Sequence, residues 1–331
     1  MGFLGRLMVL VVIGALPAAP VLAQVQQIGR TARVGWVILG VDAQARPRVS
    51  ALEGFRDGLR QSGWIEGRNI LIDLRAGDRS DAPAIAKDFI SSKTDVIFAD
   101  GAMVDGLKSY VGETPIVFTM SGDPIEAKWV SSLARPGGSV TGMSALQLEL
   151  EAKRLELLKE IQPGISRVVL FGNERHPGYK AQLAASEAAA RQLGLTLHVV
   201  PVRTADDFGA AFKAMKNWGA EAILVYSDSL VNLEQNAKAI AEFAARNRIA
   251  TISAWPGFVE AGNLLSYGPN EREFFQRAAA YIDRILRGAR PADLPVEFPA
   301  RLELVVNRNT ARALGLTIPQ SVLLRADRVI E

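Results

Sequence analysis

The sequence alternates short apolar runs with amphipathic segments, and this alternation restricts the chain to folds built from repeated strand and helix units. In the first half, apolar runs that suit buried strands begin near residues 34, 70, 96 and 116. Segments with apolar residues at helical spacing separate these runs, and the first such segment covers 49–59. Because each run is continuously apolar and each connection contains a helix, the strands should be parallel and covered on both faces.

A second series of the same kind follows a long helix predicted over 147–161. Its apolar runs begin near residues 167, 196, 222 and 250. A further strand at 264–267, a helix over 271–287 and a late strand at 302–306 leave enough chain to return to the first lobe and cross back. The sequence therefore predicts an α/β fold with two doubly wound parallel-sheet lobes joined by a three-segment hinge.

The N-terminus predicts export. A basic residue precedes the apolar run 7–16, and small residues at Val21 and Ala23 fit a signal-peptidase site before Gln24. The run is shorter than the ~20 residues needed to span a bilayer. The chain contains no cysteine, which excludes disulfides, a thiolate metal site and a lipid-bearing cysteine. We therefore expect a soluble periplasmic protein without a lipid anchor.

The predicted division of the chain has three parts. They are a signal peptide at 1–23, an N-terminal lobe at 24–141 plus 268–296, and a C-terminal lobe at 142–267 plus 297–331. The first crossing lies in the stretch 116–142, where an apolar strand breaks into a polar loop. In that loop Asp123 suits a helix cap and Pro124 suits a first helical position, so a short helix is expected next.

Charge and motif content exclude several function classes. The formal net charge of +3 is small and the Lys and Arg residues are dispersed, so nucleic acid is not an expected partner. The sequence has no G-x-S-x-G, Walker A, G-x-G-x-x-G or H-E-x-x-H motif. Its two histidines, His176 and His198, lie in a predicted loop and a predicted strand, which does not suit a metal pair. We therefore expect no catalytic site, no cofactor and no metal.

The loops that follow the strands are the candidate ligand site. In a doubly wound sheet these loops emerge at one edge, where open α/β folds bind ligands, and two facing lobes would surround one cleft. Hydroxyls and backbone amides could bind a carboxylate, an acid could bind an ammonium or hydroxyl, and an aromatic ring could cover a flat ligand. The candidate residues are Gly40, Asp42, Gly101, Ala102, Ser121, Asp123, Asn173, Asp228 and Trp255.

Several of these residues are also compatible with structural roles. Asp123 could only cap its helix, and Asn173 could only shape its turn. Asp228 is more available for a ligand, because Ser229 could supply the cap at that position. Trp255 is compatible with the core or the hinge as well as with ligand contact.

The sequence resembles the ABC transporter substrate-binding family that includes tryptophan-type aromatic amino-acid binding proteins. The resemblance extends from about residue 33 to the C-terminus and rests on several blocks together. These blocks are RVGWVI near the start, GFRDGLRQSGWIEGRNILID at 54–73, SGDPIEAKWVSSLARPGGSVTG at 121–142, KRLELLKEIQPGISRV at 153–168, FVEAGNLLSYGPN at 258–270, and ILRGARPADLPVEFPARLELVVNRNTARALGLTIPQSVLLRADRVIE at 285–331.

This resemblance implies a type I periplasmic binding protein fold and capture of a small solute for an inner-membrane ABC permease. It also implies that the loops with Gly101, Ser121 to Pro124, Asn173, Asp228 and Trp255 line the cleft. The expected solute is an amino acid or a small aromatic or carboxylate compound, and the expected state is a monomer. The loop 41–46 departs from the small residues common in the family, which leaves the solute class open. The alternative is a periplasmic sensor subunit that signals to a membrane receptor.

Overall fold

The computed structural model describes residues 30–40, 48–145, 148–176 and 178–331. The predicted signal peptide and the candidate residue Asp42 lie outside these residues. In the described part of the chain, no helix is both long and apolar enough to cross a membrane. The chain from Ala32 to Glu331 is one compact unit, and it contains two sheets that define two lobes.

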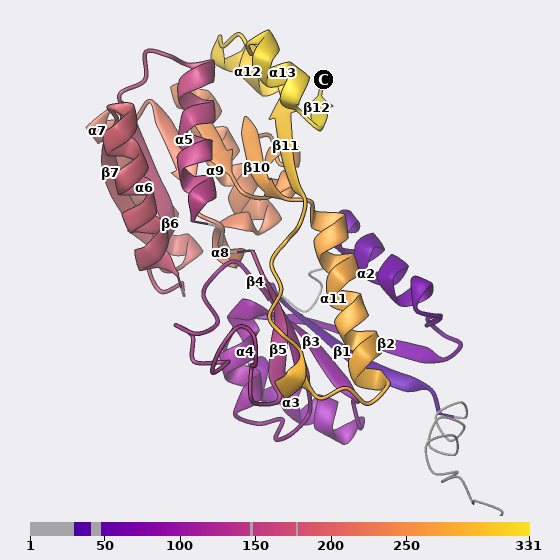
Figure 1. Cartoon of the computed structure of the whole chain (residues 1–331). Coiled ribbons are helices and arrows are strands. Elements are labelled where there is room, and N and C mark those ends of the chain that lie inside the picture. Colours follow the sequence, from indigo (N-terminus) through magenta and orange to yellow (C-terminus); the bar gives the residue numbers. More distant parts are fainter. Residues whose placement is uncertain (1–29, 41–47, 146–147, 177) are drawn as a thin grey trace, which may run out of the picture. The chain divides into compact units, whose positions relative to one another are not determined.

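The sheet of the first lobe is fully parallel in its described strands (Figure 1). Its strands are β1 (Ala32–Leu39), β2 (Ile70–Gly77), β3 (Val96–Asp100), β4 (Ile116–Met120) and β5 (Val140–Ser144). Their order across the sheet is β2-β1-β3-β4-β5. This is a doubly wound order, so the prediction of parallel strands from continuous apolar runs is confirmed.

Helices cover both faces of the first sheet because side chains along each strand alternate between the faces. The helices on one face are α2 (Val49–Gln61) and α11 (Glu271–Leu286), and those on the other are α3 (Ala82–Ser91) and α4 (Gly101–Lys108). On β3, Val96 and Phe98 pack toward α2 and α11, whereas Ile97 and Ala99 pack toward α3 and α4. Helix α11 therefore belongs to the first lobe although it comes late in the sequence.

The sheet of the second lobe repeats the same order. Its strands are β6 (Arg167–Asn173), β7 (Thr196–Val202), β8 (Ala222–Val225), β9 (Ala250–Ser253), β10 (Leu265–Pro269), β11 (Leu302–Asn307) and β12 (Arg328–Ile330). The order is β12-β11-β10-β9-β8-β6-β7, in which β11 runs antiparallel to β10 and the other pairs are parallel. The portion β7-β6-β8-β9-β10 matches the first sheet strand for strand. The predicted similarity of the two halves is therefore a similarity of topology.

Helices also cover both faces of the second sheet (Figure 1). Those on one face are α5 (Glu149–Ile161), α6 (Tyr179–Leu193), α12 (Arg308–Leu314) and α13 (Gln320–Arg325). Those on the other are α7 (Phe208–Trp218), α9 (Glu234–Asn247) and α10 (Pro256–Glu260). Short helices α8 (Ser229–Asn232), η2 (Ala205–Asp207) and η3 (Pro291–Asp293) complete the described elements.

The chain passes between the sheets after β5, after β10 and after η3. The predicted boundary at 141/142 falls within β5, which pairs with β4 as far as Ser144. The boundary at 267/268 falls within β10, which pairs with β11 as far as Pro269. The third passage runs beside β5, where the Ser144 amide donates to the Glu297 carbonyl at 2.9 Å. The first two passages therefore lie a few residues later in the chain than the predicted boundaries.

Candidate functional site

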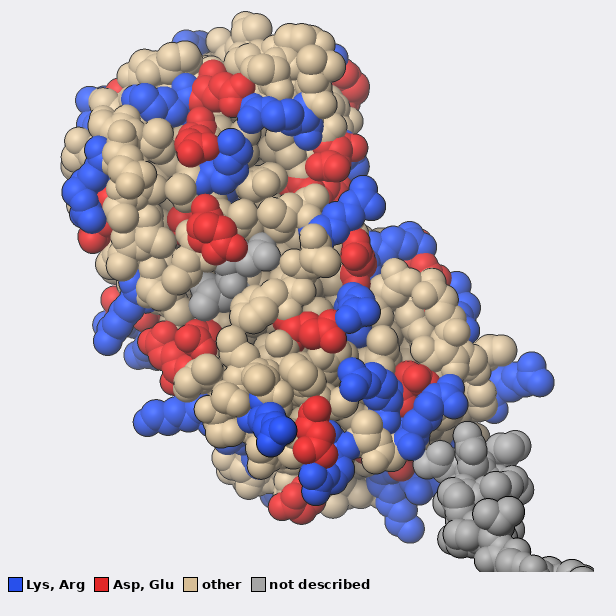
Figure 2. Space-filling view, in the orientation of Figure 1, with Lys and Arg blue, Asp and Glu red and all other residues tan. Residues whose placement is uncertain are grey.

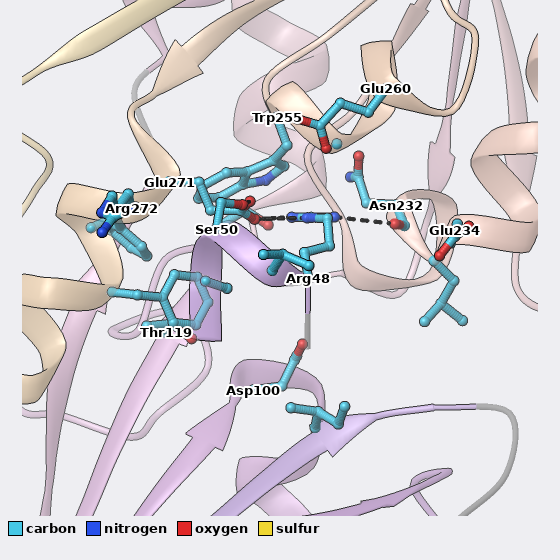
Figure 3. A pocket seen from close by; sticks show the side chains of 18 of the residues that line it. Arg48, Ser50, Asp100, Thr119, Asn232, Glu234, Trp255, Glu260, Glu271 and Arg272 are labelled. Carbon is cyan, nitrogen blue, oxygen red and sulfur yellow. Dashed lines mark hydrogen bonds and ion pairs between the residues drawn. The ribbon is translucent and has the colours of Figure 1, made fainter. Parts of the chain in front are cut away.

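A cavity of about 750 Å³ lies at the carboxyl ends of the first lobe's strands. The ends of β1, β3 and β4 contribute Leu39, Asp100 and Thr119 to its lining. The first turns of α2 and α11 also line it, as do α8, α9 and α10 of the second lobe (Figure 3). This is the position at which doubly wound sheets bind ligands, and the volume suits a small solute.

Aromatic side chains form one wall of the cavity. Trp36 on β1 lies beside Phe275, with ring centroids 6.2 Å apart, and Trp255 meets Phe274 edge-on at 5.6 Å. Trp255 is 9% exposed and packs with the core of the first lobe although α10 belongs to the second. The indole of Trp255 therefore packs with the core and also lies on the cavity wall, and its contact with a ligand stays a prediction.

Asp228 presents a buried carboxylate to the cavity. Its side chain is 4% exposed, and it follows β8 at the start of α8. One oxygen accepts a hydrogen bond from the Leu230 amide at 2.8 Å, and the other accepts one from the Asn173 side-chain amide at 3.4 Å. Asn173 itself shapes its turn, since its Oδ1 accepts from the Arg175 amide at 3.0 Å. Asp228 thus both caps its turn and lines the cavity, with neutral donors as its hydrogen-bond partners.

A polar network joins the two lobes next to Asp228. The Ser121 hydroxyl donates to the Ser227 carbonyl and lies 3.3 Å from Nε2 of His176. The Ser227 hydroxyl accepts from Nε1 of Trp255 at 2.6 Å. Ser121 follows β4 of the first lobe, whereas the other members belong to the second. The network therefore fixes Trp255 and the strand-end loops of both lobes together.

His176 is the titratable ring of this network. Burial lowers its pKa, and Asp228, Arg79 and Glu126 act on it as nearby charges, the two acids raising the pKa and the arginine lowering it. Among the residues that the structure describes, Nδ1 of the ring has no hydrogen-bond partner. No group of His, Cys, Asp or Glu within the described ranges is arranged to hold a metal ion.

An ion pair that the sequence did not suggest lines the cavity. Nε of Arg48 donates to Glu271 at 2.8 Å, and the Ser50 hydroxyl donates to the other oxygen of the same carboxylate (Figure 3). Glu271 is only 2% exposed. Burial acts against the charge of Arg48, but Glu271 outweighs it and raises the pKa of the guanidinium. Arg48 and Glu271 are 223 positions apart in sequence, so no local pattern links them.

The remaining cations of the lining also have carboxylate partners. Arg272 pairs with Glu53 at 2.6 Å and Arg328 with Glu260 at 2.7 Å. Lys238 pairs with Glu234 one turn earlier on α9. On the visible face of the molecule, basic and acidic side chains are likewise interspersed (Figure 2). The cations around the cavity are thus compensated, whereas Asp228 has neutral hydrogen-bond donors.

The residues proposed from the sequence separate into two groups. Ser121, Asp228 and Trp255 line the cavity, and Asn173 supports Asp228. Four others do not line it, namely Gly40, Gly101, Ala102 and Asp123. The structure describes no position for Asp42.

Each residue in the second group has a local structural role. The Gly40 amide donates to the Gly77 carbonyl at 2.9 Å. A Cβ on Gly101 would stand 2.6 Å from that of Met120, so glycine permits close packing there. The Ala102 amide donates a hydrogen bond to the Asp100 side chain, and Asp100, rather than Ala102, lines the cavity. Asp123 accepts a hydrogen bond from the Ile125 amide at 2.7 Å, as a helix cap would. Turns follow it, however, so the prediction of a short helix at this point is wrong.

The chain is similar to several known proteins. The chain is 26% identical to the tyrosine-binding protein of Clostridioides difficile, over 80% of this chain and 76% of that one. The structure of an ABC domain from Streptococcus pneumoniae in complex with L-Trp matches with a TM-score of 0.80 at 26% identity, covering 91% of this chain and 100% of that one. The ligand-free, open structure of a substrate-binding protein with adhesive properties from Clostridium difficile matches at 0.65 and 25% identity, covering 91% and 99%.

The structural relatives and a family profile both match most of the chain. Both structural relatives cover nearly the whole described chain, and the two-lobed parallel architecture is the type I periplasmic binding protein fold. At nearly equal identity, the agreement is greater with the structure that holds L-Trp than with the open one. A profile of the family described as ABC transporter substrate binding protein matches residues 37–330. The chain therefore belongs to the ABC transporter substrate-binding protein family.

Proposed function

We propose that this protein binds an amino acid with a flat, aromatic side chain in the cavity between its lobes. The observation that carries the proposal is the juxtaposition of an aromatic wall with the buried carboxylate of Asp228. An ammonium group would compensate that carboxylate, whose present hydrogen-bond partners are neutral amides. A planar ring would pack against Trp36 and Trp255.

Two further observations support this choice of solute. The cations of the lining are already paired with carboxylates, so the cavity offers little for a polyanionic ligand such as a phosphate ester. The tyrosine-binding protein and the complex with L-Trp are similar to this chain along most of its length. An aromatic amino acid is therefore the first solute class to test.

A thermal-shift screen tests the proposal with matched probes. The purified protein is unfolded and refolded to remove bound solute, and then heated with L-tryptophan, L-tyrosine, L-leucine, tryptamine or indole-3-propionate. A ligand at a hundredfold excess over its dissociation constant stabilises the folded state by ~2.7 kcal/mol. We expect the aromatic amino acids to raise the melting temperature most, and indole-3-propionate, which lacks the ammonium, to raise it least. Stabilisation by indole-3-propionate equal to that by L-tryptophan would contradict the role given to Asp228.

We further propose that the protein is exported, works as a monomer in the periplasm and delivers its solute to an inner-membrane ABC permease. The leader of residues 1–23 and the family membership support this role. Mass spectrometry of the protein from a periplasmic extract should find an N-terminus at Gln24. Uptake of the labelled solute should fall when the gene is deleted, and an unchanged uptake rate would favour a sensor role instead.

A further inference from the structure

The side chain of Arg48 connects the two lobes at the cavity, and we propose that it acts as a latch that sets the affinity for the solute by holding the lobes together. The latch consists of Arg48, Glu271 and Ser50 in the first lobe and of Gly257 and Asn232 in the second. Arg48 is therefore a positioning residue: it holds the two lobes relative to each other, and all of its contacts form without ligand.

The first-lobe side of the latch is a fixed anchor. Both oxygens of the buried Glu271 carboxylate are occupied, one by Nε and Nη2 of Arg48 and the other by the Ser50 hydroxyl. Glu271 lies in the first turn of α11, and Ser50 lies in the first turn of α2. Because two packed helices hold the carboxylate, the direction of the Arg48 guanidinium is set before it meets the second lobe.

The second-lobe side is a socket made by Gly257 and the Asn232 carbonyl. Nη1 of Arg48 donates to that carbonyl at 3.4 Å (Figure 3). The Arg48 stem lies against α10, where a Cβ on Gly257 would stand only 2.4 Å from Cδ of the arginine. The φ of Gly257 is outside the left-handed region, so an alanine fits the backbone there, and the three atoms nearest to its Cβ would all belong to Arg48.

The socket is connected to the backbone of Asp228, whose carboxylate is proposed to bind the ligand. The Asn232 side-chain amide donates to the Asp228 carbonyl at 2.8 Å, and the Asn232 backbone amide donates to the same carbonyl at 3.2 Å. Closure of the latch therefore acts on the turn that carries Asp228. A side chain that favours the joined lobes changes the apparent dissociation constant through the population of the binding-competent state.

The test uses the full-length chain with Gly257→Ala, which fills the socket. The matched control is Gly209→Ala on α7, where an added Cβ meets no atom within 4 Å. Because the natural sequence has no cysteine, Lys87→Cys and Lys213→Cys introduce a unique pair of spin-label sites, one on exposed α3 and one on exposed α7. Double electron–electron resonance then measures the distance between the two spin labels, one on each lobe, with and without L-tryptophan.

We expect Gly257→Ala to lengthen or broaden the distance distribution in the absence of ligand and to weaken L-tryptophan binding by about tenfold. Gly209→Ala should leave both measurements as in the parent. In an Arg48→Ala background, Gly257→Ala should have no further effect, because the side chain that occupies the socket is gone. Arg48→Lys should recover little, since an ammonium cannot contact Glu271 through a fork and also reach Asn232.

Two results would overturn the latch. One is a distance distribution in Gly257→Ala identical to that of the parent, and the other is an undiminished effect of Gly257→Ala in the Arg48→Ala background. The affinity part of the inference rests on the proposed function, but the distance measurement without ligand does not. Failure of the parent protein to bind any aromatic amino acid would therefore refute the proposed solute, while the spin-label distances would still decide whether the latch exists.

Discussion

In the proposed function, the buried carboxylate of Asp228 binds the ammonium group of the solute. Asp228→Asn keeps an oxygen for the Leu230 amide and removes the charge. We expect it to weaken binding of amino acids by about 1.5–3 kcal/mol, the range for hydrogen bonds to charged groups, while unfolding of the ligand-free protein changes little. Isothermal titration and thermal unfolding measure the two quantities.

Asp123→Asn is the matched control for this substitution. It makes the same change at a carboxylate that caps a turn outside the cavity, where Oδ1 accepts from the Ile125 amide. It should leave the dissociation constant unchanged. Equal losses of affinity in the two variants would mean that the charge of Asp228 makes no specific contribution to ligand binding.

His176 predicts a dependence of stability on pH. Its pKa is lowered in the folded state, chiefly by burial, so below the ordinary value of 6.5 the unfolded chain binds more protons than the folded one. The free energy of unfolding should therefore fall as the pH drops through 6.5 and keep falling until the pH is below the lowered pKa. Asp228, Arg79 and Glu126 are the charged groups that act on the ring.

Urea unfolding between pH 7.5 and pH 5 tests this contribution. The slope of unfolding free energy against pH should be smaller in His176→Gln, because the variant has no imidazole to protonate. Identical slopes in the two proteins would assign the acid sensitivity to the carboxylates instead.

At the level of single residues, the sequence located strand-end residues well and long-range partners poorly. Ser121, Asp228 and Trp255 could be placed near one cavity because the carboxyl ends of parallel strands share an edge. Glu271 could be recognised only as an acid in the first turn of a helix, since its partner Arg48 comes from the other end of the chain. Such pairs become visible only when the fold brings them together.

Among the elements, α2 and α11 come so close together at Gly54 that no Cβ fits at this position. A Cβ on Gly54 would stand 2.2 Å from the Arg272 carbonyl oxygen. Gly54→Ala should therefore destabilise the fold by about 1–3 kcal/mol, as overpacking does. Gly209→Ala, in an open helical position, should stabilise it slightly. Equal stabilities of these two variants in urea would contradict the close approach of the helices.

A buried arginine of α5, ion-paired within the helix, attaches α5 to the second sheet. Arg154 donates to Glu151 at 2.7 Å and to the Tyr267 carbonyl on β10 at 2.9 Å. Arg154→Met should cost about 3–5 kcal/mol, because it leaves a buried carboxylate without its cation. The double variant Glu151→Met with Arg154→Met should regain part of this loss in chemical unfolding. A double variant less stable than Arg154→Met would show that the pair itself stabilises the fold.

The elements themselves were predictable where the apolar pattern was continuous. The strands around residues 34, 70, 96 and 116 form a parallel sheet as expected. The helix expected after Asp123 fails because the segment turns early: Lys128 takes a left-handed φ of 58°. Trp129 then packs against Phe118 and donates to Asp105 at 2.7 Å. Tertiary contacts of one tryptophan thus prevail over a good capping signal.

For the whole molecule, topology and family identify the class of protein but leave the solute to be argued from the site. Two similar lobes were expected from the spacing of the apolar runs, and the structure adds that their sheets share one strand order. The antiparallel strand β11 was not, because strand direction depends on where the chain returns after the third passage. The cavity depends on contributions from both lobes, so its charge balance could not be predicted before they were assembled.

Isothermal titration of the refolded protein with L-tryptophan and L-tyrosine tests the proposed function. We expect saturable binding of one ligand per chain, with a negative heat-capacity change from burial of the ring. Asp228→Asn should weaken the binding and Asp123→Asn should not. A refolded protein with native thermal unfolding that binds neither amino acid at millimolar concentration would contradict the proposed function.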